Sequence, residues 1–349
     1  MKKMSAEIFS TLSIILLCWT ALIAADAIVS TILKLTAGIA FKKAFLWGLI
    51  SLLVPPVFIL YGTLVERNTF KVKTVEIGFT DLPSGFDGYR IVHISDIHAR
   101  SFIGREKHLK RAVGKINALE ADMIAFSGDL ITMGPAELDG LSEILSGLKA
   151  ADGVFSVLGN HDYSMYSDMG EEGKAMAMER LIGEERAMGW NLLMNGNAVI
   201  RHGLDSIAVV GVENTSPSRH FPSKGDLTRA AAGTDGMFRI LLSHDPLHWE
   251  SEIIGQDFPL TLSGHTHSMQ FSLLGWSPSR YMFPQYRGLY STGKSGSSRS
   301  RYSGTEQQEN GNPETNLQHL YVNPGLGETI FPARIGVRPE ITLITLRKK

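Results

Sequence analysis

Residues 91–98, Ile-Val-His-Ile-Ser-Asp-Ile-His, join an apolar, strand-like run to polar side chains that follow it directly. The same arrangement recurs at 123–129, 154–162, 240–245 and 260–267. In open α/β sheets, ligands bind just beyond the carboxyl ends of the strands. Five such turns would bring their polar groups to one place, so the sequence predicts a single functional site at that edge.

Segments with helical spacing separate these runs and complete the fold prediction. Residues 104–119, 135–148, 172–188 and 246–255 carry apolar positions at helical spacing with mixed charge. Alternation of strands and helices predicts an α/β fold with largely buried sheets. The alternating run at 340–346 predicts a last strand.

The polar side chains in the five turns are of the types that bind divalent metal ions. They are Asp96, His98, Asp129, Asn160, His244, His265 and His267. All offer oxygen or nitrogen, which suits Mn, Fe, Zn, Co or Ni. The single cysteine, Cys18, excludes both an internal disulfide and a Cys-based zinc site. Seven groups exceed the need of one ion, so the set predicts two ions that share a carboxylate.

A two-metal centre is suited to in-line displacement at phosphorus. It lowers the pKa of a bridging water and neutralises charge on the attacking and leaving oxygens. Two divalent ions, less the charges of Asp96, Asp129 and a bridging hydroxide, leave a site of about +1 that attracts phosphate.

The motifs Asp-x-His, Gly-Asp, Gly-Asn-His-Asp, a lone His and Gly-His-x-His follow one another at positions 96, 129, 160, 244 and 265. This order and spacing resemble the calcineurin-like metallophosphoesterases, from about Val72 to Leu346. The resemblance implies two packed β-sheets flanked by helices. Stretches at 79–88, 274–278 and 321–327 resemble the membrane-tethered bacterial branch, which includes proteins similar to the UDP-2,3-diacylglucosamine pyrophosphatases of lipid A biosynthesis.

The resemblance also implies a role for each site residue. The ligands of the first metal would be Asp96, His98 and His267. Those of the second would be Asn160, His244 and His265, with Asp129 as the bridge. His161 would hydrogen-bond the phosphate oxygen or the leaving group, and Asp162 would be its partner. Two residues depart from the family's pattern and bear on substrate specificity, namely Arg100 and Ser268.

The function expected from these residues is the hydrolysis of phosphodiester or pyrophosphate bonds by a metal-bridging hydroxide. Two divalent ions are the expected cofactors, with Mn as the first candidate. The expected substrate is lipid-linked, such as UDP-diacylglucosamine, because the site is paired with apolar segments that would fix it beside a bilayer. Two alternatives are a broad-specificity phosphodiesterase or phosphomonoesterase, and a non-catalytic membrane scaffold with the same fold.

Two uncharged runs, Ile8–Ala25 and Phe45–Val65, are each about long enough to cross a ~30 Å hydrocarbon layer as a helix. They predict a membrane anchor over residues 1–70, followed by a catalytic domain over 71–349. Pro55 and Pro56 predict a kink in the second span.

The boundaries of the first span leave two alternatives open. The helix could continue past Asp26 to Leu33, which would place a carboxylate in the membrane, although we expect Asp26 near the interface. A cleaved signal peptide is the second alternative, with a small-x-small site at 25–27.

Basic residues near the span ends predict the orientation. Five lie on the side of the catalytic domain, Lys2, Lys3, Arg67, Lys71 and Lys73, against three in the connecting loop, Lys34, Lys42 and Lys43. The positive-inside rule therefore predicts a cytoplasmic catalytic domain. The two spans predict a multi-pass protein, and the resemblance to the bacterial branch implies the inner (plasma) membrane of a bacterium.

Composition separates the same two parts. The whole chain has a net charge of -1, but its first 65 residues carry +3 and the remainder -4. No basic field is available for nucleic acid, which is excluded as a partner. Residues 293–318 are polar, and their composition predicts a flexible loop in which Arg299 and Arg301 are solvated. His93, on a strand leading into the site, is expected to be a packed structural histidine.

Overall fold

The computed structural model describes residues 2–292, 298–300, 317–329 and 331–349. Most of the predicted flexible loop at 293–318, including Arg301, lies outside the described residues. Within that loop the structure places the short strand β11, Ser298–Ser300, beside β10.

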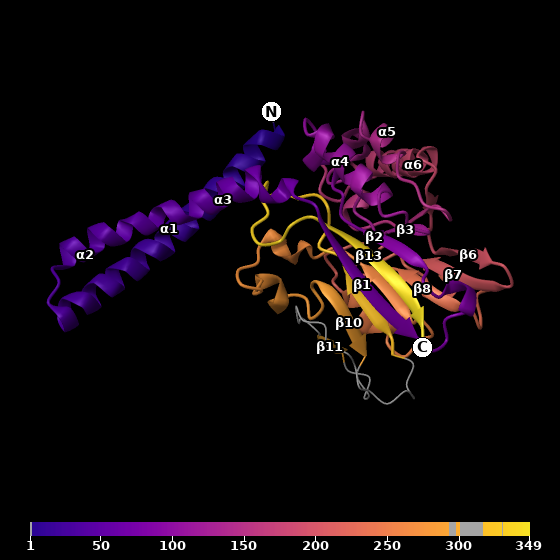
Figure 1. Cartoon of the computed structure of the whole chain (residues 1–349). Coiled ribbons are helices and arrows are strands. Elements are labelled where there is room, and N and C mark those ends of the chain that lie inside the picture. Colours follow the sequence, from indigo (N-terminus) through magenta and orange to yellow (C-terminus); the bar gives the residue numbers. More distant parts are fainter. Residues whose placement is uncertain (1, 293–297, 301–316, 330) are drawn as a thin grey trace.

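A long helical hairpin projects from one side of the molecule (Figure 1). Its first arm is α1, Lys2–Ala37, and its second arm comprises α2, η1, α3 and η2, which span Phe41–Gly48, Leu49–Leu53, Val54–Leu64 and Glu66–Asn68. The arms pack along each other, and the indole N–H of Trp19 donates to the carbonyl oxygen of Leu52 at 2.7 Å. Both arms are long and apolar enough to be candidate membrane spans.

The hairpin differs from the sequence prediction in two details. The first helix continues past Ala25 to Ala37, so Asp26 lies within it, because the first helix-ending residue is Gly38, with a φ of +67°. The predicted kink takes the form of the 3₁₀ turn η1, after which Pro55 and Pro56 occupy the first turn of α3. Proline is tolerated there because the N–H groups of a first turn have no partner within the helix.

Two mixed sheets form the rest of the molecule. The first has the strand order β1-β13-β2-β3-β4-β5, with bounds Lys71–Phe79, Glu340–Lys348, Arg90–Ile94, Met123–Phe126, Val154–Ser156 and Asn191–Leu192. Its strands β2 to β5 are parallel, whereas β13 runs antiparallel to β2.

The second sheet has the order β11-β10-β12-β9-β8-β7-β6. The bounds from β10 onward in this order are Gly288–Thr292, His319–Val322, Leu260–Ser263, Phe238–Leu242, Asp205–Gly211 and Gly196–His202. Strands β7, β8, β9 and β12 are parallel to one another. Each sheet thus contains a parallel block whose strands end at a common edge.

Helices cover the outer faces of both sheets. Those associated with the first sheet are α4, α5 and α6, spanning Glu106–Asn117, Ser142–Leu145 and Glu171–Ala187. Those of the second are α7, Leu227–Ala230, and the π-helical turn η7, Trp249–Ile253. The helix predicted over 135–148 is broken into η5, Pro135–Leu138, and α5, because Gly140 between them has a φ of +76°. The remaining 3₁₀ turns are η3 Ser84–Phe86, η4 Ala99–Phe102, η6 His161–Tyr163, η8 His267–Gln270 and η9 Pro278–Tyr281.

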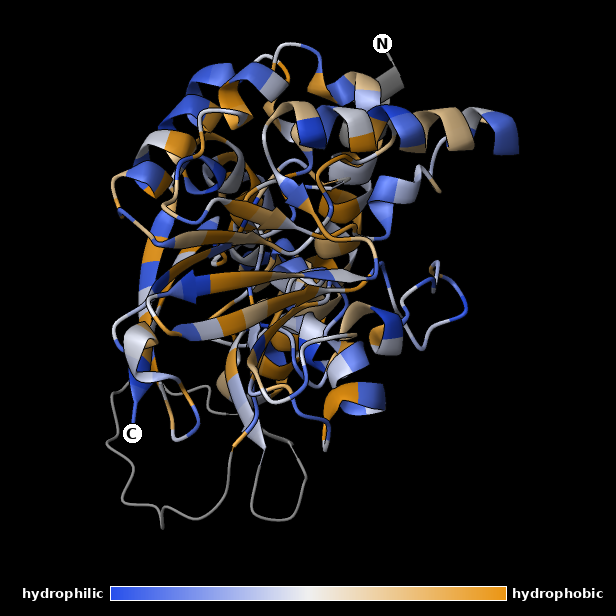
Figure 2. Ribbon diagram, turned by 90° about the vertical axis from the view of Figure 1, so that its right-hand side faces the viewer, coloured by the Kyte–Doolittle hydropathy of each residue, from blue (hydrophilic) through white to orange (hydrophobic). Residues whose placement is uncertain are grey.

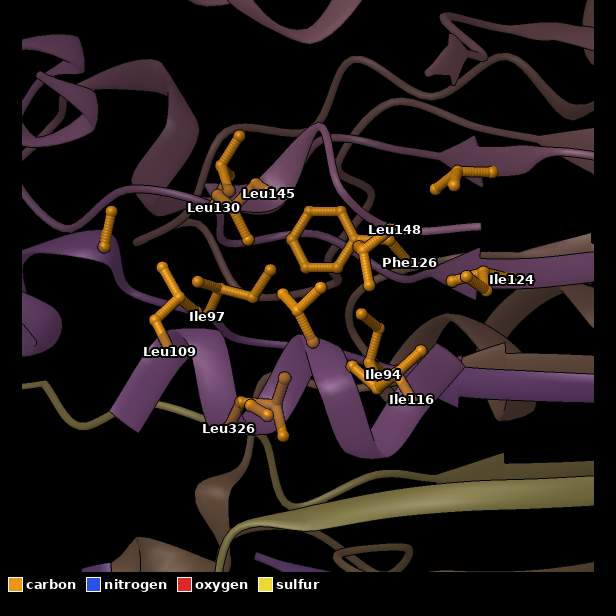
Figure 3. Close-up of a cluster of buried hydrophobic side chains, with 14 of the residues drawn as sticks. Ile94, Ile97, Leu109, Ile116, Ile124, Phe126, Leu130, Leu145, Leu148 and Leu326 are labelled. Carbon is orange, nitrogen blue, oxygen red and sulfur yellow. The ribbon is translucent and has the colours of Figure 1, made fainter. Parts of the chain in front are cut away.

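The core consists of three apolar layers that follow from strand alternation. Ile91 points between the sheets, whereas Val92 and Ile94 point outward toward α4. Figure 3 shows the outer cluster, where Ile116 of α4 lies beside Ile94. In Figure 2 the apolar residues gather on the strands in the middle of the molecule. The two-sheet fold with flanking helices is therefore as predicted.

Candidate metal centre

The seven predicted ligands all follow strands of the two parallel blocks. Asp96 and His98 follow β2, Asp129 follows β3 and Asn160 follows β4 in the first sheet. In the second sheet, His244 follows β8, while His265 and His267 follow β9. The site is therefore assembled by both sheets, at the carboxyl ends of their parallel strands.

One cluster of donor atoms comprises Asp96, His98 and His267. Nε2 of His267 lies 3.0 Å from Nε2 of His98 and 3.2 Å from Oδ1 of Asp96. All three side chains are buried. Two imidazole nitrogens and one carboxylate oxygen facing one another make a suitable set for one divalent ion.

A second cluster comprises Asp129, His244 and His265. Oδ2 of Asp129 is 3.1 Å from Nε2 of His244, and it is also 3.6 Å from Nε2 of His98 in the first cluster. One carboxylate oxygen thus faces both donor sets, which is the position that a bridging ligand requires. Asn160 lines the same cavity as Asp129 and His265.

Two buried donor atoms test whether this arrangement fits a metal. Among the described residues, Oδ1 of Asn160 has no hydrogen-bond partner, and Nε2 of His244 faces a carboxylate oxygen of Asp129 at 3.1 Å. Leaving an acceptor such as Oδ1 of Asn160 buried and unpaired is costly unless another group satisfies it. Coordination of divalent ions would use both atoms, so the donor set fits two ions.

Outer hydrogen bonds orient the ligand rings. Nδ1 of His244 is 2.7 Å from the carbonyl oxygen of Ser127, and Nδ1 of His98 is 3.3 Å from Oγ1 of Thr132. Because a carbonyl oxygen can only accept, His244 carries its proton on Nδ1 in the neutral form and keeps the lone pair on Nε2. The nitrogen that faces the centre is then the one available to a metal.

Electrostatics favour metal-binding protonation states for most ligands. Burial lowers the pKa of His98 well below its ordinary value, helped by the nearby His161. Burial alone would raise the pKa of Asp129, but His244, His161 and His98 outweigh it and hold that pKa well below the usual range. The centre therefore offers a neutral imidazole beside an ionised carboxylate.

His244 behaves differently from His98. Burial alone would lower its pKa, but attraction to Asp129 and Asp96 prevails and raises the pKa to about 10. Metal binding at Nε2 would displace the proton that His244 carries at neutral pH.

The ligand loops have an unusual backbone conformation. Five of the seven predicted ligands have φ values between +43° and +70°: Asp96, His98, Asp129, His265 and His267. Side chains other than glycine rarely adopt this region, and such residues gather at functional sites, where surrounding structure holds them. The turns thus aim the side chains inward at a local conformational cost.

Glycines between the ligands allow the loops to approach closely. Gly128 has a φ of +97°, and a Cβ added there would lie 2.6 Å from the backbone nitrogen of Gly159 and 2.8 Å from Nδ1 of His244. A Cβ at Gly264 would overlap Ser95 and Asp96. The Gly-Asp and Gly-His motifs therefore place loops from different strands in direct contact.

His161 and Asp162 occupy different environments, and their predicted pairing is wrong. Nδ1 of His161 is 2.9 Å from the carbonyl oxygen of Thr132. The carboxylate of Asp162 instead accepts the backbone N–H groups of four residues at 2.8 to 3.1 Å: Asp129, Leu130, Ile131 and Gly159. Asp162 thus holds together the loops after β3 and β4, a role that needs its full set of acceptors.

The metal clusters open into a cavity of about 330 Å³. Asn160, His161 and His265 line it, together with Tyr166, Phe221 and Gln270. Phe221 and Gln270 lie outside the motifs, so no local signal identified them. His93, by contrast, is buried, with Nε2 2.9 Å from Oγ of Ser127, and burial lowers its pKa to about 3. It is a packed structural histidine, as expected.

Comparison with known proteins supports this interpretation. The family model described as "Calcineurin-like phosphoesterase" matches residues 89–269. A zebrafish (Danio rerio) "transmembrane protein with metallophosphoesterase domain" is 28% identical over 323 residues, which cover 87% of this chain and 64% of the zebrafish protein. The alignment thus leaves about a third of that relative unmatched.

Two bacterial relatives are also similar. The uncharacterized metallophosphoesterase YkuE of Bacillus subtilis is 28% identical over 291 residues, which cover 82% of this chain and 89% of YkuE. The UDP-2,3-diacylglucosamine pyrophosphatase LpxG of Chlamydia trachomatis is 26% identical over 271 residues, covering 65% of this chain and 78% of LpxG.

Proposed function

Because this chain belongs to the calcineurin-like phosphoesterase family, we propose that it is a dinuclear-metal hydrolase of phosphodiester or pyrophosphate bonds. The observation that carries the proposal is the position of Asp129, whose Oδ2 faces Nε2 of both His98 and His244. A carboxylate shared by two donor sets is what a pair of adjacent ions requires.

The two sets divide the predicted ligands. Asp96, His98 and His267 would hold one ion, and His244, His265 and Asn160 the other. When bound, the ions would supply a hydroxide nucleophile at neutral pH and neutralise charge on the phosphoryl oxygens. The site offers only oxygen and nitrogen donors, which suit Mn, Fe, Zn, Co and Ni. Among these ions, Mn is our first candidate.

The chain's own residues position and protonate the substrate. Nδ1 of His161 is bonded to the carbonyl oxygen of Thr132, which turns Nε2 of His161 toward the cavity. The protonated ring would donate from Nε2 to a phosphoryl oxygen or to the leaving oxygen. The amide of Asn160 would contact the same phosphoryl group.

The proposed substrate class is a lipid-linked diphosphate such as UDP-diacylglucosamine. Two observations support it: the candidate membrane spans of the hairpin and the similarity to LpxG, the pyrophosphatase described above. The two candidate spans and the bacterial relatives support a bacterial inner-membrane location. The basic residues near the span ends support a catalytic domain on the cytoplasmic side.

The test uses the full chain in detergent, with and without Mn²⁺, on UDP-2,3-diacylglucosamine and on bis(p-nitrophenyl) phosphate. We expect Mn²⁺-dependent turnover of the lipid substrate and two bound ions per chain by elemental analysis. Asp129→Ala should abolish turnover, whereas Asp139→Ala, which removes an exposed partner of Arg180, should not.

Each alternative predicts a different result. Turnover of the soluble diester without the lipid substrate would indicate a broad-specificity phosphodiesterase. Absence of bound ions and of all turnover would indicate a membrane scaffold, and activity that survives Asp129→Ala would contradict the mechanism.

A further inference from the structure

A second cavity, of about 170 Å³, is lined by three arginines, Arg67, Arg100 and Arg105. We call it the arginine cavity. The lining contains one carboxylate, Glu328, so its formal charge is +2. Guanidinium groups form planar, bidentate hydrogen bonds that match phosphoryl oxygens. The lining therefore has the chemistry of a phosphate-binding site.

The arginine cavity adjoins the metal centre. Thr329 lines both cavities. Its backbone N–H and its hydroxyl group both donate to Oε1 of Gln270, at 3.0 and 3.2 Å, and Gln270 also lines the metal cavity. Arg100 is only two residues from the predicted ligand His98. One ligand could thus extend from the metal centre past Thr329.

Two of the three arginines, Arg105 and Arg67, are held in place by hydrogen bonds to the protein. Arg105 donates to Glu328 Oε2 at 3.2 Å and to Asn68 Oδ1 at 2.7 Å. Arg67 donates from Nη1 to the carbonyl oxygen of Pro332 at 2.9 Å. Fixing these long side chains before binding reduces the entropy lost when a ligand is bound.

We propose that the arginine cavity binds the second phosphoryl group of a diphosphate substrate while the first lies at the metal centre. This inference rests on the proposed function. Arg100 provides the contact nearest to the ligand loop. The cavity then favours substrates with two phosphoryl groups over simple phosphodiesters. It also gives a role to Arg100, one of the two residues that depart from the family's pattern.

The kinetic test compares Arg100→Gln with Arg201→Gln, which changes an arginine on β6 outside both cavities. For the diphosphate substrate, Arg100→Gln should raise KM at least tenfold, with kcat within about threefold. For bis(p-nitrophenyl) phosphate, KM should change less than twofold, and Arg201→Gln should match wild type on both. An equal KM increase on both substrates, or none on either, would overturn the proposal.

A binding measurement distinguishes failure of this proposal from failure of the proposed function. Calorimetry on the metal-free full chain should show inorganic pyrophosphate binding at least tenfold more weakly to Arg100→Gln than to wild type or Arg201→Gln. Equal binding would count against the cavity even if no turnover is ever found. If phosphatidylglycerol in phosphatidylcholine nanodiscs competes with the diphosphate substrate only when Arg100 is present, the cavity binds a lipid headgroup instead.

A second inference comes from an independent observation, an exposed apolar segment after η8. Five large side chains are exposed between residues 273 and 282: Leu273, Leu274, Trp276, Tyr281 and Met282. We call this segment the apolar loop. Its backbone lies close to the base of the hairpin, because Ser272 N–H donates to Ile335 O at 2.7 Å and Arg334 N–H donates to Gly62 O of α3 at 3.4 Å.

We infer that the apolar loop enters the bilayer surface next to the hairpin, and this inference rests on the hairpin's being a membrane anchor. In Figure 1 the orange segment that carries η8 and η9 lies on the same side as the hairpin. Trp276 and Tyr281 are of the residue types that prefer the membrane interface. Such insertion would keep the opening of the metal cavity, which Met269 lines, beside the lipid.

The chain allows a site-specific test because Cys18 is its only cysteine. In a Cys18→Ser background, Leu274→Cys carries an NBD fluorophore in phosphatidylcholine nanodiscs that contain doxyl-labelled lipid. Leu204→Cys is the matched control, since Leu204 and Leu274 are both fully exposed, at 106% and 101%, and Leu204 is next to β6, on the side opposite the hairpin in Figure 1. Leu16→Cys, within α1, is the positive control.

We expect a blue-shifted emission and doxyl quenching at positions 274 and 16 but not at 204. Quenching at 16 with a water-like signal at 274 would overturn the inference and leave the anchor intact. A water-like signal at 16 as well would refute both the anchor and the apolar loop's insertion.

Discussion

His161 and Asp162 show how neighbouring residues of one motif take separate parts in the site. His161 lines the metal cavity, and its Nδ1 is 2.9 Å from the carbonyl oxygen of Thr132. Asp162 instead accepts backbone N–H groups from the loops after β3 and β4. At the residue scale, substitution of His161 should therefore affect the reaction, and substitution of Asp162 should affect the stability of the loops.

His161→Gln should lower kcat about 10²- to 10⁴-fold, the usual contribution of a general acid or base. The side chain lies outside the two proposed ligand sets, so the variant should keep two ions per chain and its melting temperature. Kinetics with bis(p-nitrophenyl) phosphate and elemental analysis provide the check. Loss of one ion would instead assign His161 to the ligands.

Asp162→Asn should destabilise the folded protein by about 2–4 kcal/mol. The new NH₂ group would point at backbone N–H donors, leaving several of them unsatisfied in a buried place. Urea unfolding of the catalytic part measures the change, with His161→Gln as the neighbouring control. Wild-type stability in Asp162→Asn would contradict the loop-holding role.

At the scale of elements, helix α6 packs a carboxyl group against the first sheet. Glu185 is fully buried, and its Oε2 accepts the hydroxyl of Ser156, on β4, at 2.5 Å. Burial, followed by the charge of Asp162, raises the pKa of Glu185 to about 8. The helix is therefore fixed to the strand that leads to Asn160 through a carboxyl group that stays protonated at neutral pH.

This pKa predicts how stability depends on pH. The contribution of Glu185 is fully present below its unfolded pKa of about 4.5 and decreases as pH rises to about 8, because only the unfolded state ionises in that window. Glu185→Gln should remove this loss and be more stable than wild type at pH 8, by roughly 4 kcal/mol for a pKa raised from 4.5 to about 8. The measurement is urea unfolding of both proteins at pH 5 and pH 8. If the difference in unfolding free energy between Glu185→Gln and wild type is the same at both pH values, that result would contradict the raised pKa.

At the scale of the whole molecule, the metal centre joins the two sheets. Asp96, His98 and Asp129 come from the first sheet, and His244 and His267 from the second. Bound ions would therefore act as cross-links between the layers in addition to their chemical role. Binding to the folded state alone stabilises it by about 2.7 kcal/mol at a free ion concentration of 100 Kd.

Removal of metal should lower the melting temperature of the Mn²⁺-loaded protein by about 5 °C or more, since ~1 kcal/mol corresponds to 2–4 °C in a domain of this size class. Differential scanning fluorimetry before and after EDTA measures this shift, and readdition of Mn²⁺ should reverse it. The melting temperature of Asp129→Ala, which lacks the proposed bridging carboxylate, should change much less when EDTA is added. An unchanged melting temperature in the wild type would argue against ions that link the sheets.

Short-range patterns in the sequence were sufficient for much of this protein. The apolar runs before Asp96, Asp129 and His244 are strands, and the motifs contain the residues that converge at their ends. These predictions succeed because strand alternation, turn glycines and metal-donor chemistry act over a few residues. The two apolar arms of the hairpin were found for the same reason, although the extent of the first helix was underestimated.

Only the tertiary structure decided which distant groups meet. Asp162 was assigned to its sequence neighbour, yet its carboxylate accepts N–H groups about 30 residues away. Arg67 contacts Pro332 at a separation of 265 residues, and no local pattern connects them. Side-chain partners across two sheets depend on how the layers pack, whereas the ligand types depend on the chain alone. The sequence by itself therefore determined the chemistry available to the metal centre, and the packing of the sheets determined its geometry and the cavity beside it.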